Sequence, residues 1–200
     1  MQIHDINQIT LPRTERQLST RQMVEKIALC FVLACLTGLA AQIKWYLPNN
    51  PVPFTFQTAA VVLSALWLKK WGALSQLLYL CLGFCGIPWF ANQASGWNVL
   101  FLPTTGYLIG FVFTAFLGGW LVEKYYSRFR FFTSIGLFVI TALFTHGFGI
   151  LYLHSWMIIS HREVPTLSSL LIQGTLPFLG FDFLKIMAVT ACFSFKESHR

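Results

Sequence analysis

Two ionisable residues near the C-terminus, Asp182 and Lys185, stand inside an apolar stretch. Their i,i+3 spacing places both side chains on one face of a helix. Because a charge at the bilayer centre costs about 2.5–3.5 kcal/mol on insertion scales, such residues are usually paired or functional. The pair is therefore either a structural ion pair or a binding site for a polar solute. We favour the solute site, because a paired carboxylate and ammonium still leave acceptors and donors free for a polar solute. Gly174, Pro177 and Gly180 also loosen the helix just before the pair and can expose backbone groups to a cavity.

A third polar group, His146, lies in the middle of another apolar stretch. A lone histidine in a membrane helix is more often an interhelical hydrogen-bond partner than a metal ligand. No cluster of His, Cys or carboxylate residues has metal-ligand spacing in the sequence, and the five cysteines lie in apolar stretches typical of packing residues. We therefore expect no metal site and no cofactor.

The sequence lacks the motifs of several catalytic classes. No G-x-x-x-x-G-K-[ST] run occurs, so this chain cannot hydrolyse ATP by the P-loop route. A nucleophile elbow and an H-E-x-x-H motif are also absent. An enzymatic role would have to use Asp182, Lys185 or His146. A binding or transport subunit fits better than an enzyme.

The composition indicates that lipid surrounds most of the chain. Of 200 residues, 56% are hydrophobic and 10% are charged, and the mean hydropathy is +0.62. Soluble domains carry roughly 25% charged residues. A transmembrane helix needs about 20 apolar residues, so the length allows about six spans with short loops. The sequence predicts an all-α integral membrane protein.

Apolar runs and their breakers divide the chain into six expected transmembrane helices. The expected spans are 24–43, 54–68, 73–90 and 100–122, a fifth that starts near Phe131, and a sixth that ends near Phe195. The expected organisation is an N-terminal tail at 1–23, a six-helix membrane domain at 24–195 and a C-terminal tail at 196–200.

The basic residues predict the orientation. If the N-terminus is cytoplasmic, 11 of the 14 Lys and Arg residues lie inside, Lys44 and Arg162 lie outside, and Lys185 lies within a span. This bias follows the positive-inside rule and places both termini in the cytoplasm. We therefore expect a multi-pass protein of the plasma membrane. The net charge of +7 then reflects topology, and we expect no nucleic-acid partner.

The loops expected on the outer face, 47–54 and 90–98, carry almost no charge and are rich in Pro, Asn and other neutral polar residues. Irregular backbone is tolerated at membrane depth where it lines a cavity. These loops are therefore either a cover over an outward-facing cavity or ordinary short connectors.

Four short blocks occur in order along the chain. They read PVPFTFQT at 51–58, GALSQLLYL at 72–80, PTTGYLIGF at 103–111 and PFLGFDFLK at 177–185. Each block resembles a signature of the BioY family, the biotin-specific S-components, or substrate-capture subunits, of energy-coupling factor (ECF) transporters. The resemblance implies an ECF S-component-like fold.

The resemblance implies a six-helix subunit that captures biotin from the outer face. An energising module, made of a transmembrane T-component and two ATPases, would then drive its release inside. This division of labour agrees with the missing P-loop. A solitary biotin transporter, or an S-component for another small heterocyclic vitamin, is the alternative.

Such subunits contact the T-component through small residues of the first helix, because small side chains let helices approach closely. Packing within the chain explains these residues equally well. The candidates here are Ala28, Cys30, Ala34, Cys35 and Gly38.

The resemblance also implies a biotin site. The ureido ring of biotin has two N–H donors and one carbonyl acceptor, so Asp182 is expected to accept a hydrogen bond from the ring. Lys185 either binds the valerate carboxylate or holds Asp182 in place. The bicyclic body requires apolar and aromatic walls. The other residues expected at the site are Phe54, Gln57, Trp89, Asn92, Thr105, Gly106 and Tyr107.

Two blocks depart from the family pattern. Thr105 and Gly106 stand where the family has two glycines, and Gly180 and Phe181 stand where proline and glycine usually precede the aspartate. We expect these changes to alter loop geometry and affinity and to leave the fold intact.

Overall fold

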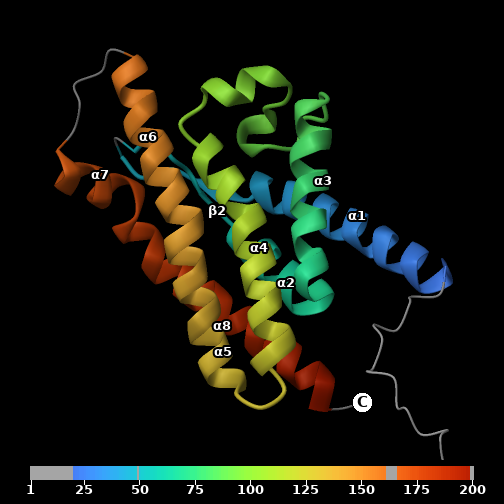
Figure 1. Ribbon diagram of the computed structural model, residues 1–200. Coiled ribbons are helices and arrows are strands. Elements are labelled where there is room, and N and C mark those ends of the chain that lie inside the picture. The colour runs from blue at the N-terminus through green and yellow to red at the C-terminus, as the bar shows by residue number, and fades with distance from the viewer. Residues whose placement is uncertain (1–19, 49, 161–165, 199–200) are drawn as a thin grey trace, which may run out of the picture.

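Helices make up almost all of the regular structure in residues 20–48, 50–160 and 166–198, which the computed structural model describes (Figure 1). The α-helices are α1 (Thr20–Gln42), α2 (Gln57–Leu68), α3 (Gly72–Phe84), α4 (Thr105–Tyr125), α5 (Arg130–Ile140), α6 (Gly147–Ile159), α7 (Leu167–Gly174) and α8 (Leu176–Ser198). A π-helical turn, Thr141–His146, joins α5 to α6 without a break. Helical structure therefore occurs in each of the six regions expected from the sequence.

Within the described residues, four helical segments are long and apolar enough to cross a membrane, which confirms the prediction of a helical membrane protein. They are 20–42, 105–125, the continuous rod 130–159, and 170–194. The helices α2 and α3 contain 12 and 13 residues. At 1.5 Å per residue each is shorter than the hydrocarbon core, which is about 30 Å thick.

Three predicted helix boundaries were wrong. The second helix begins at Gln57 rather than near residue 54, because Phe54 and Thr55 form a strand. The third helix ends at Phe84 rather than near residue 90, and the fourth begins at Thr105 rather than near residue 100. Gly86 follows α3 with a φ of +115°, a left-handed conformation that favours glycine. Pro88 and Pro103 also disfavour continued helix on either side of the loop. Two short 3₁₀ turns, η2 (Ala91–Gln93) and η3 (Trp97–Phe101), fill the space between the helices.

The predicted tails fall partly outside the described residues. Residues 1–19 of the N-terminal tail and residues 199–200 of the C-terminal tail lie outside them. The helix α1 begins at Thr20, and α8 continues to Ser198.

A short strand pair connects α1 to α2. Strand β1 (Lys44–Trp45) pairs with β2 (Phe54–Thr55) in an antiparallel register that sets Trp45 opposite Phe54. The rings of these two residues stack at 5.4 Å between centroids. The pair turns the chain back toward α1, since the Phe56 amide donates to the Ala40 carbonyl. It thereby positions the start of α2 beside α8.

The helix α4 lies in the middle of the bundle and packs against α2, α3, α5 and α6 (Figure 1). Small residues allow these close approaches, as is common between membrane helices. At Gly119 a side chain would collide with the carbonyl of Lys69, in the turn η1 (Lys69–Trp71) between α2 and α3. This contact fixes how closely the α2–α3 pair approaches α4.

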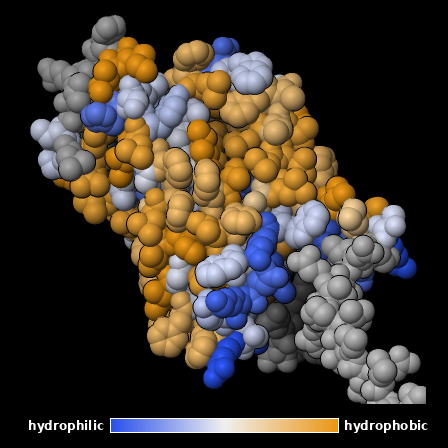
Figure 2. Space-filling view, viewed as in Figure 1, coloured by the Kyte–Doolittle hydropathy of each residue, from blue (hydrophilic) through white to orange (hydrophobic). Residues whose placement is uncertain are grey.

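The outer surface is suited to lipid. Figure 2 shows apolar residues over most of the visible face, with hydrophilic residues gathered where α4 meets α5 and at the start of α1. On α1 the large exposed side chains include Val24, Phe31, Val32 and Leu39. Such a surface is costly in water and stable in a bilayer.

Replacing Gly119 by Ala should destabilise the protein. The new methyl group meets the Lys69 backbone, which cannot move aside as a flexible side chain would. The expected loss is about 1–3 kcal/mol, measured by thermal unfolding in detergent. Gly147→Ala is the matched control, because no atom lies within 4 Å of the added Cβ. Equal unfolding temperatures for the two variants would contradict this account of the α4 packing.

Candidate functional site

A narrow cavity lies between α2, α4, the π-helical turn and α8. It contains about 600 Å³ of space not filled by protein atoms, including the part open to the surroundings. Loop residues contribute to its wall, among them Val52, Pro53, Phe90 and Ala91. Of the two alternatives for these loops, their contribution to the wall favours a role at a cavity over simple connectors. The wall is mainly apolar and carries a few convergent polar groups, which is typical of a small-molecule site.

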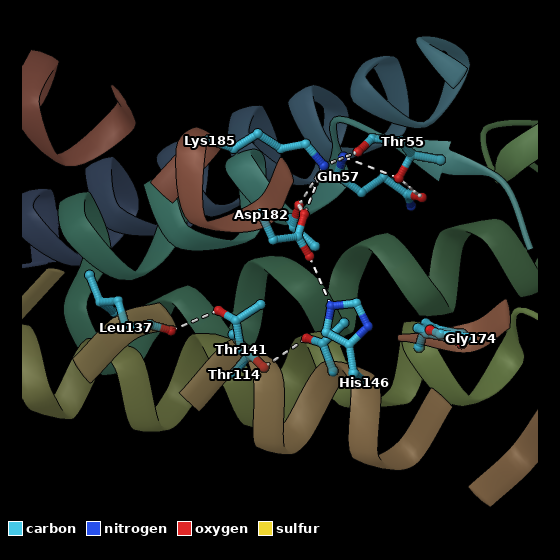
Figure 3. Close-up of polar contacts among 12 residues, drawn as sticks. Thr55, Gln57, Thr114, Leu137, Thr141, His146, Gly174, Asp182 and Lys185 are labelled. Atoms are coloured by element: carbon cyan, nitrogen blue, oxygen red, sulfur yellow. Dashed lines mark hydrogen bonds and ion pairs between the residues drawn. The ribbon is translucent and has the colours of Figure 1, made fainter. Parts of the chain in front are cut away.

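Asp182 is the centre of the polar part of the wall (Figure 3). Its side chain is only 3% exposed, so the carboxylate requires compensation inside the protein. Oδ1 accepts from the Thr58 hydroxyl and from the Lys185 ammonium, each at 2.7 Å. Oδ2 lies 2.9 Å from Nε2 of His146. Three parts of the chain, α2, α8 and the π-helical turn, therefore meet at one carboxylate.

Lys185 is also held within the protein. Its Nζ donates to the Thr55 carbonyl at 2.8 Å, to Asp182 at 2.7 Å and to the Thr58 hydroxyl at 3.3 Å. An ammonium has three hydrogens, and these contacts account for all of them. The Phe56 ring lies 5.7 Å from the same nitrogen and adds a cation–π contact. Lys185 thus ties strand β2 to α8.

The side-chain amide of Gln57 is held by a hydrogen bond at each of its two polar atoms. Its side-chain oxygen accepts from the Thr55 hydroxyl at 3.0 Å, and its side-chain nitrogen donates to the Tyr79 hydroxyl at 2.9 Å. Tyr79 is fully buried on α3. The block at 51–58 therefore supplies both a partner for Lys185 and a fixed amide in the cavity wall.

The π-helical turn directs polar residues inward. Thr141, Thr145 and His146 are all buried, and the Thr145 hydroxyl bonds to that of Thr114 on α4 at 2.9 Å. Each extra residue in a π turn rotates the helix face that follows it, and such turns are frequent at functional sites. The prediction that His146 is an interhelical hydrogen-bond partner is confirmed by its contact with Asp182 on α8.

Aromatic rings form the apolar side of the cavity. Tyr107 and Phe178 both line it, and their ring centroids lie 5.9 and 6.0 Å from that of His146. The Tyr107 hydroxyl donates to the Gly174 carbonyl at 2.9 Å, where the helix is broken between α7 and α8. Phe54 stacks on Phe178 at 4.2 Å and supports the wall from behind.

Of the nine predicted site residues, four line the cavity: Gln57, Tyr107, Asp182 and Lys185. The other five lie outside the wall. Phe54 backs Phe178, as described above. The Trp89 indole donates to the Tyr79 carbonyl at 3.0 Å and packs against Gly38, and Asn92 is exposed and donates to the Tyr46 hydroxyl at 2.5 Å.

Thr105 and Gly106 make structural contacts at the start of α4. The Thr105 hydroxyl donates to the Leu102 carbonyl at 3.0 Å. Gly106 packs against the backbone of Phe148 on α6. The preceding residue, Thr104, lines the cavity instead.

Several wall residues were not among the predicted nine. Thr58, Thr104, Phe178 and His146 are examples. Thr58 and Phe178 belong to the conspicuous blocks, so their position in the sequence was a usable signal. For His146, the only signal in the sequence was a polar side chain in an apolar stretch.

The predicted partner-contact residues divide into two groups. Ala34 is fully buried, and Gly38 is buried against Trp89, so both take part in packing within the chain. Ala28 lies on the exposed face of α1. Of the two predicted cysteines, Cys30 is buried and Cys35 is half-buried.

Comparison with known proteins gives one consistent result. The family model described as "BioY family" matches residues 12–198. The biotin transporter BioY of Thermotoga maritima is 38% identical over 142 residues, which cover 70% of this chain and 78% of that protein. A probable biotin transporter BioY of Pyrococcus horikoshii is 34% identical over 162 residues, 80% of this chain and 89% of that protein.

A solved structure shares the fold. The crystal structure of the S-component for biotin from an ECF-type ABC transporter superposes with a TM-score of 0.72 at 21% identity. The match covers 90% of this chain and 95% of that one. The family match over nearly the whole length and the shared fold lead to one conclusion: the chain belongs to the BioY family.

Proposed function

We propose that this chain is the biotin-binding subunit of a biotin uptake transporter and is not an enzyme. The observation that carries the proposal is a buried Asp182, paired with Lys185 and His146, in the wall of an aromatic-lined cavity. Membership of the BioY family supports it, as do relatives named as biotin transporters. Biotin enters from the outer face and leaves on the inner face.

The chemistry of the wall suits the ureido ring of biotin. A carboxylate offers about four acceptor positions, and Asp182 uses three of them, two on Oδ1 and one on Oδ2. One position on Oδ2 can therefore accept a ureido N–H. The rings of Tyr107 and Phe178 provide apolar contact for the bicyclic body. Because its three hydrogens are already engaged, Lys185 holds Asp182 and leaves the valerate carboxylate to neutral donors.

In the membrane the chain crosses six times, with α2 and α3 as the second and third crossings. The helices α2 and α3 are shorter than the hydrocarbon core is thick. The extended segment before α2 and the loop after α3 span the rest of that thickness. Both termini are cytoplasmic, and the membrane is the plasma membrane. The excess of Lys and Arg on one side supports this orientation.

Release of biotin requires energy that this chain does not supply through a P-loop. We propose that an ECF T-component and its two ATPases supply it, and the S-component fold supports this assignment. Ala28, on the exposed face of α1, is the one predicted partner-contact alanine that remains available for such a contact. Uptake of biotin by cells without any energising module would instead identify a solitary transporter.

The proposal is tested by binding of radiolabelled biotin to the purified chain in detergent. We expect saturable binding at one site per chain. Absence of binding by a correctly folded sample, checked by thermal unfolding, would reject biotin as the ligand. Competition by other heterocyclic vitamins determines whether one of them is the true solute.

Asp182→Asn should weaken biotin binding and leave membrane insertion intact. The change removes the charge from the hydrogen bond to the ureido ring, so the expected loss is about 1.5–3 kcal/mol of binding free energy. Thr190→Val is the matched control, since it removes a buried hydroxyl from the same helix away from the cavity. Unchanged affinity together with lower stability would show that Asp182 is purely structural.

A double-mutant cycle tests the role assigned to Lys185. Lys185→Met leaves the buried charge of Asp182 unpaired and should cost about 3–5 kcal/mol of stability. Adding Asp182→Asn should recover much of that loss, because no net charge then remains at the site. If Lys185→Met instead keeps the stability of the wild type and binds biotin more weakly, but binds biotin amide as well as the wild type does, then Lys185 binds the valerate carboxylate.

The orientation can be tested with a native thiol. Cys85, exposed just after α3, should react with a membrane-impermeant maleimide added to intact cells. In a Cys85→Ser background, a cysteine introduced at Ser127 between α4 and α5 should react only after permeabilisation. The opposite labelling pattern would reverse the topology.

A further inference from the structure

Among the described residues, one buried polar side-chain atom of the cavity wall has no hydrogen-bond partner. Nδ1 of His146 is buried and makes no hydrogen bond within residues 20–48, 50–160 and 166–198. The side chain is about 3% exposed and belongs to the cavity wall. Gln76 and Thr175 also carry an unpaired buried atom, but neither residue lines the cavity. His146 is therefore the one of these three residues that belongs to the cavity wall.

The hydrogen-bond partners determine what this atom offers. A carboxylate only accepts, so the Nε2 of His146 donates to Asp182 Oδ2. In a neutral imidazole the other nitrogen is then an acceptor with one free lone pair. We take the ring to be uncharged, since Lys185 already balances the charge of Asp182 and a further buried charge would lack compensation. Nδ1 thus presents an acceptor and no donor.

The orientation of the ring is fixed by its surroundings. Figure 3 shows the nitrogen that bonds Asp182 directed toward it and the second ring nitrogen directed away. Tyr107 packs edge-on against the ring, and Phe178 packs against it at an angle. A fixed acceptor that is buried without a donor costs free energy, and a solute N–H can remove that cost.

We propose that Nδ1 of His146 accepts a hydrogen bond from an N–H group of the solute and so selects solutes with two N–H donors. The inference rests on the proposed function: in biotin the donor is one ureido N–H, and the free position on Asp182 Oδ2 accepts the other. Asp182 therefore acts twice, once as a direct acceptor and once by holding the imidazole in the tautomer that accepts.

Two substitutions separate these roles. In His146→Gln, the side-chain amide can still donate to Asp182 but presents no acceptor at the Nδ1 position. In His146→Asn, the shorter side chain can keep an acceptor near the Nδ1 position but cannot reach Asp182. The probes are biotin and two analogues, in each of which a ring oxygen replaces one of the two ureido N–H groups.

The measurement is the dissociation constant of each probe for the wild-type chain and the two variants. We expect both analogues to bind the wild type more weakly than biotin, and the analogue without the N–H that faces His146 to bind about tenfold more weakly. His146→Gln should bind biotin about tenfold more weakly and should no longer distinguish biotin from that analogue. His146→Asn should retain the discrimination.

The inference is overturned if His146→Gln distinguishes biotin from both analogues as well as the wild type does. In that case biotin binding by the wild type still stands, so the proposed function is unaffected. If the folded wild type binds no biotin, both proposals fail together. Should a variant not fold, ¹⁵N spectra of the histidine-labelled wild type decide: biotin must shift an unprotonated Nδ1 resonance, and an unchanged spectrum contradicts the proposal.

Discussion

A carboxylate buried among membrane helices has to be compensated by the groups around it, and this requirement at Asp182 determines how the site is assembled. The compensating donors come from three places: Thr58 on α2, Lys185 on α8 and His146 at the end of the π-helical turn. These contacts would be lost if α8 shifted along its axis by one helical turn, or if it rotated so that Asp182 faced away from α2. The charge that is expensive to insert therefore also fixes the register of the helices that surround the cavity.

The contacts around Asp182 also leave room beside them for a solute. Lys185 reaches back to the Thr55 carbonyl in β2 and so holds Thr55 in the cavity wall, next to Val52 and Pro53 of the preceding loop. Tyr107 also lines the cavity, and its hydroxyl is bonded to the Gly174 carbonyl at the α7–α8 break. The polar groups are thus positioned before any solute arrives, which lowers the entropic cost of binding.

Much of this organisation could be predicted from the sequence because it depends on local pattern. Apolar runs located the helices, and the i,i+3 spacing placed Asp182 and Lys185 on one face. The helix ends near Gly86 and Pro103 were missed, since turn chemistry overrode the apolar pattern. Asn92 adopts a φ of 64° in a loop that directs its side chain outward, to Tyr46. The contact of His146 with Asp182 joins residues 36 apart in sequence on separate helices, and the π-helical turn that permits it has no simple sequence signature.

The most direct measurement of the central claim is a structure of the purified chain with biotin bound. We predict a ureido nitrogen within hydrogen-bond distance of Asp182 Oδ2, with the bicyclic body between Tyr107 and Phe178. Lys185 should keep its contacts with Asp182 and the Thr55 carbonyl. A structure in which the valerate carboxylate displaces Asp182 from Lys185, or in which the ureido ring lies away from Asp182, would contradict the account.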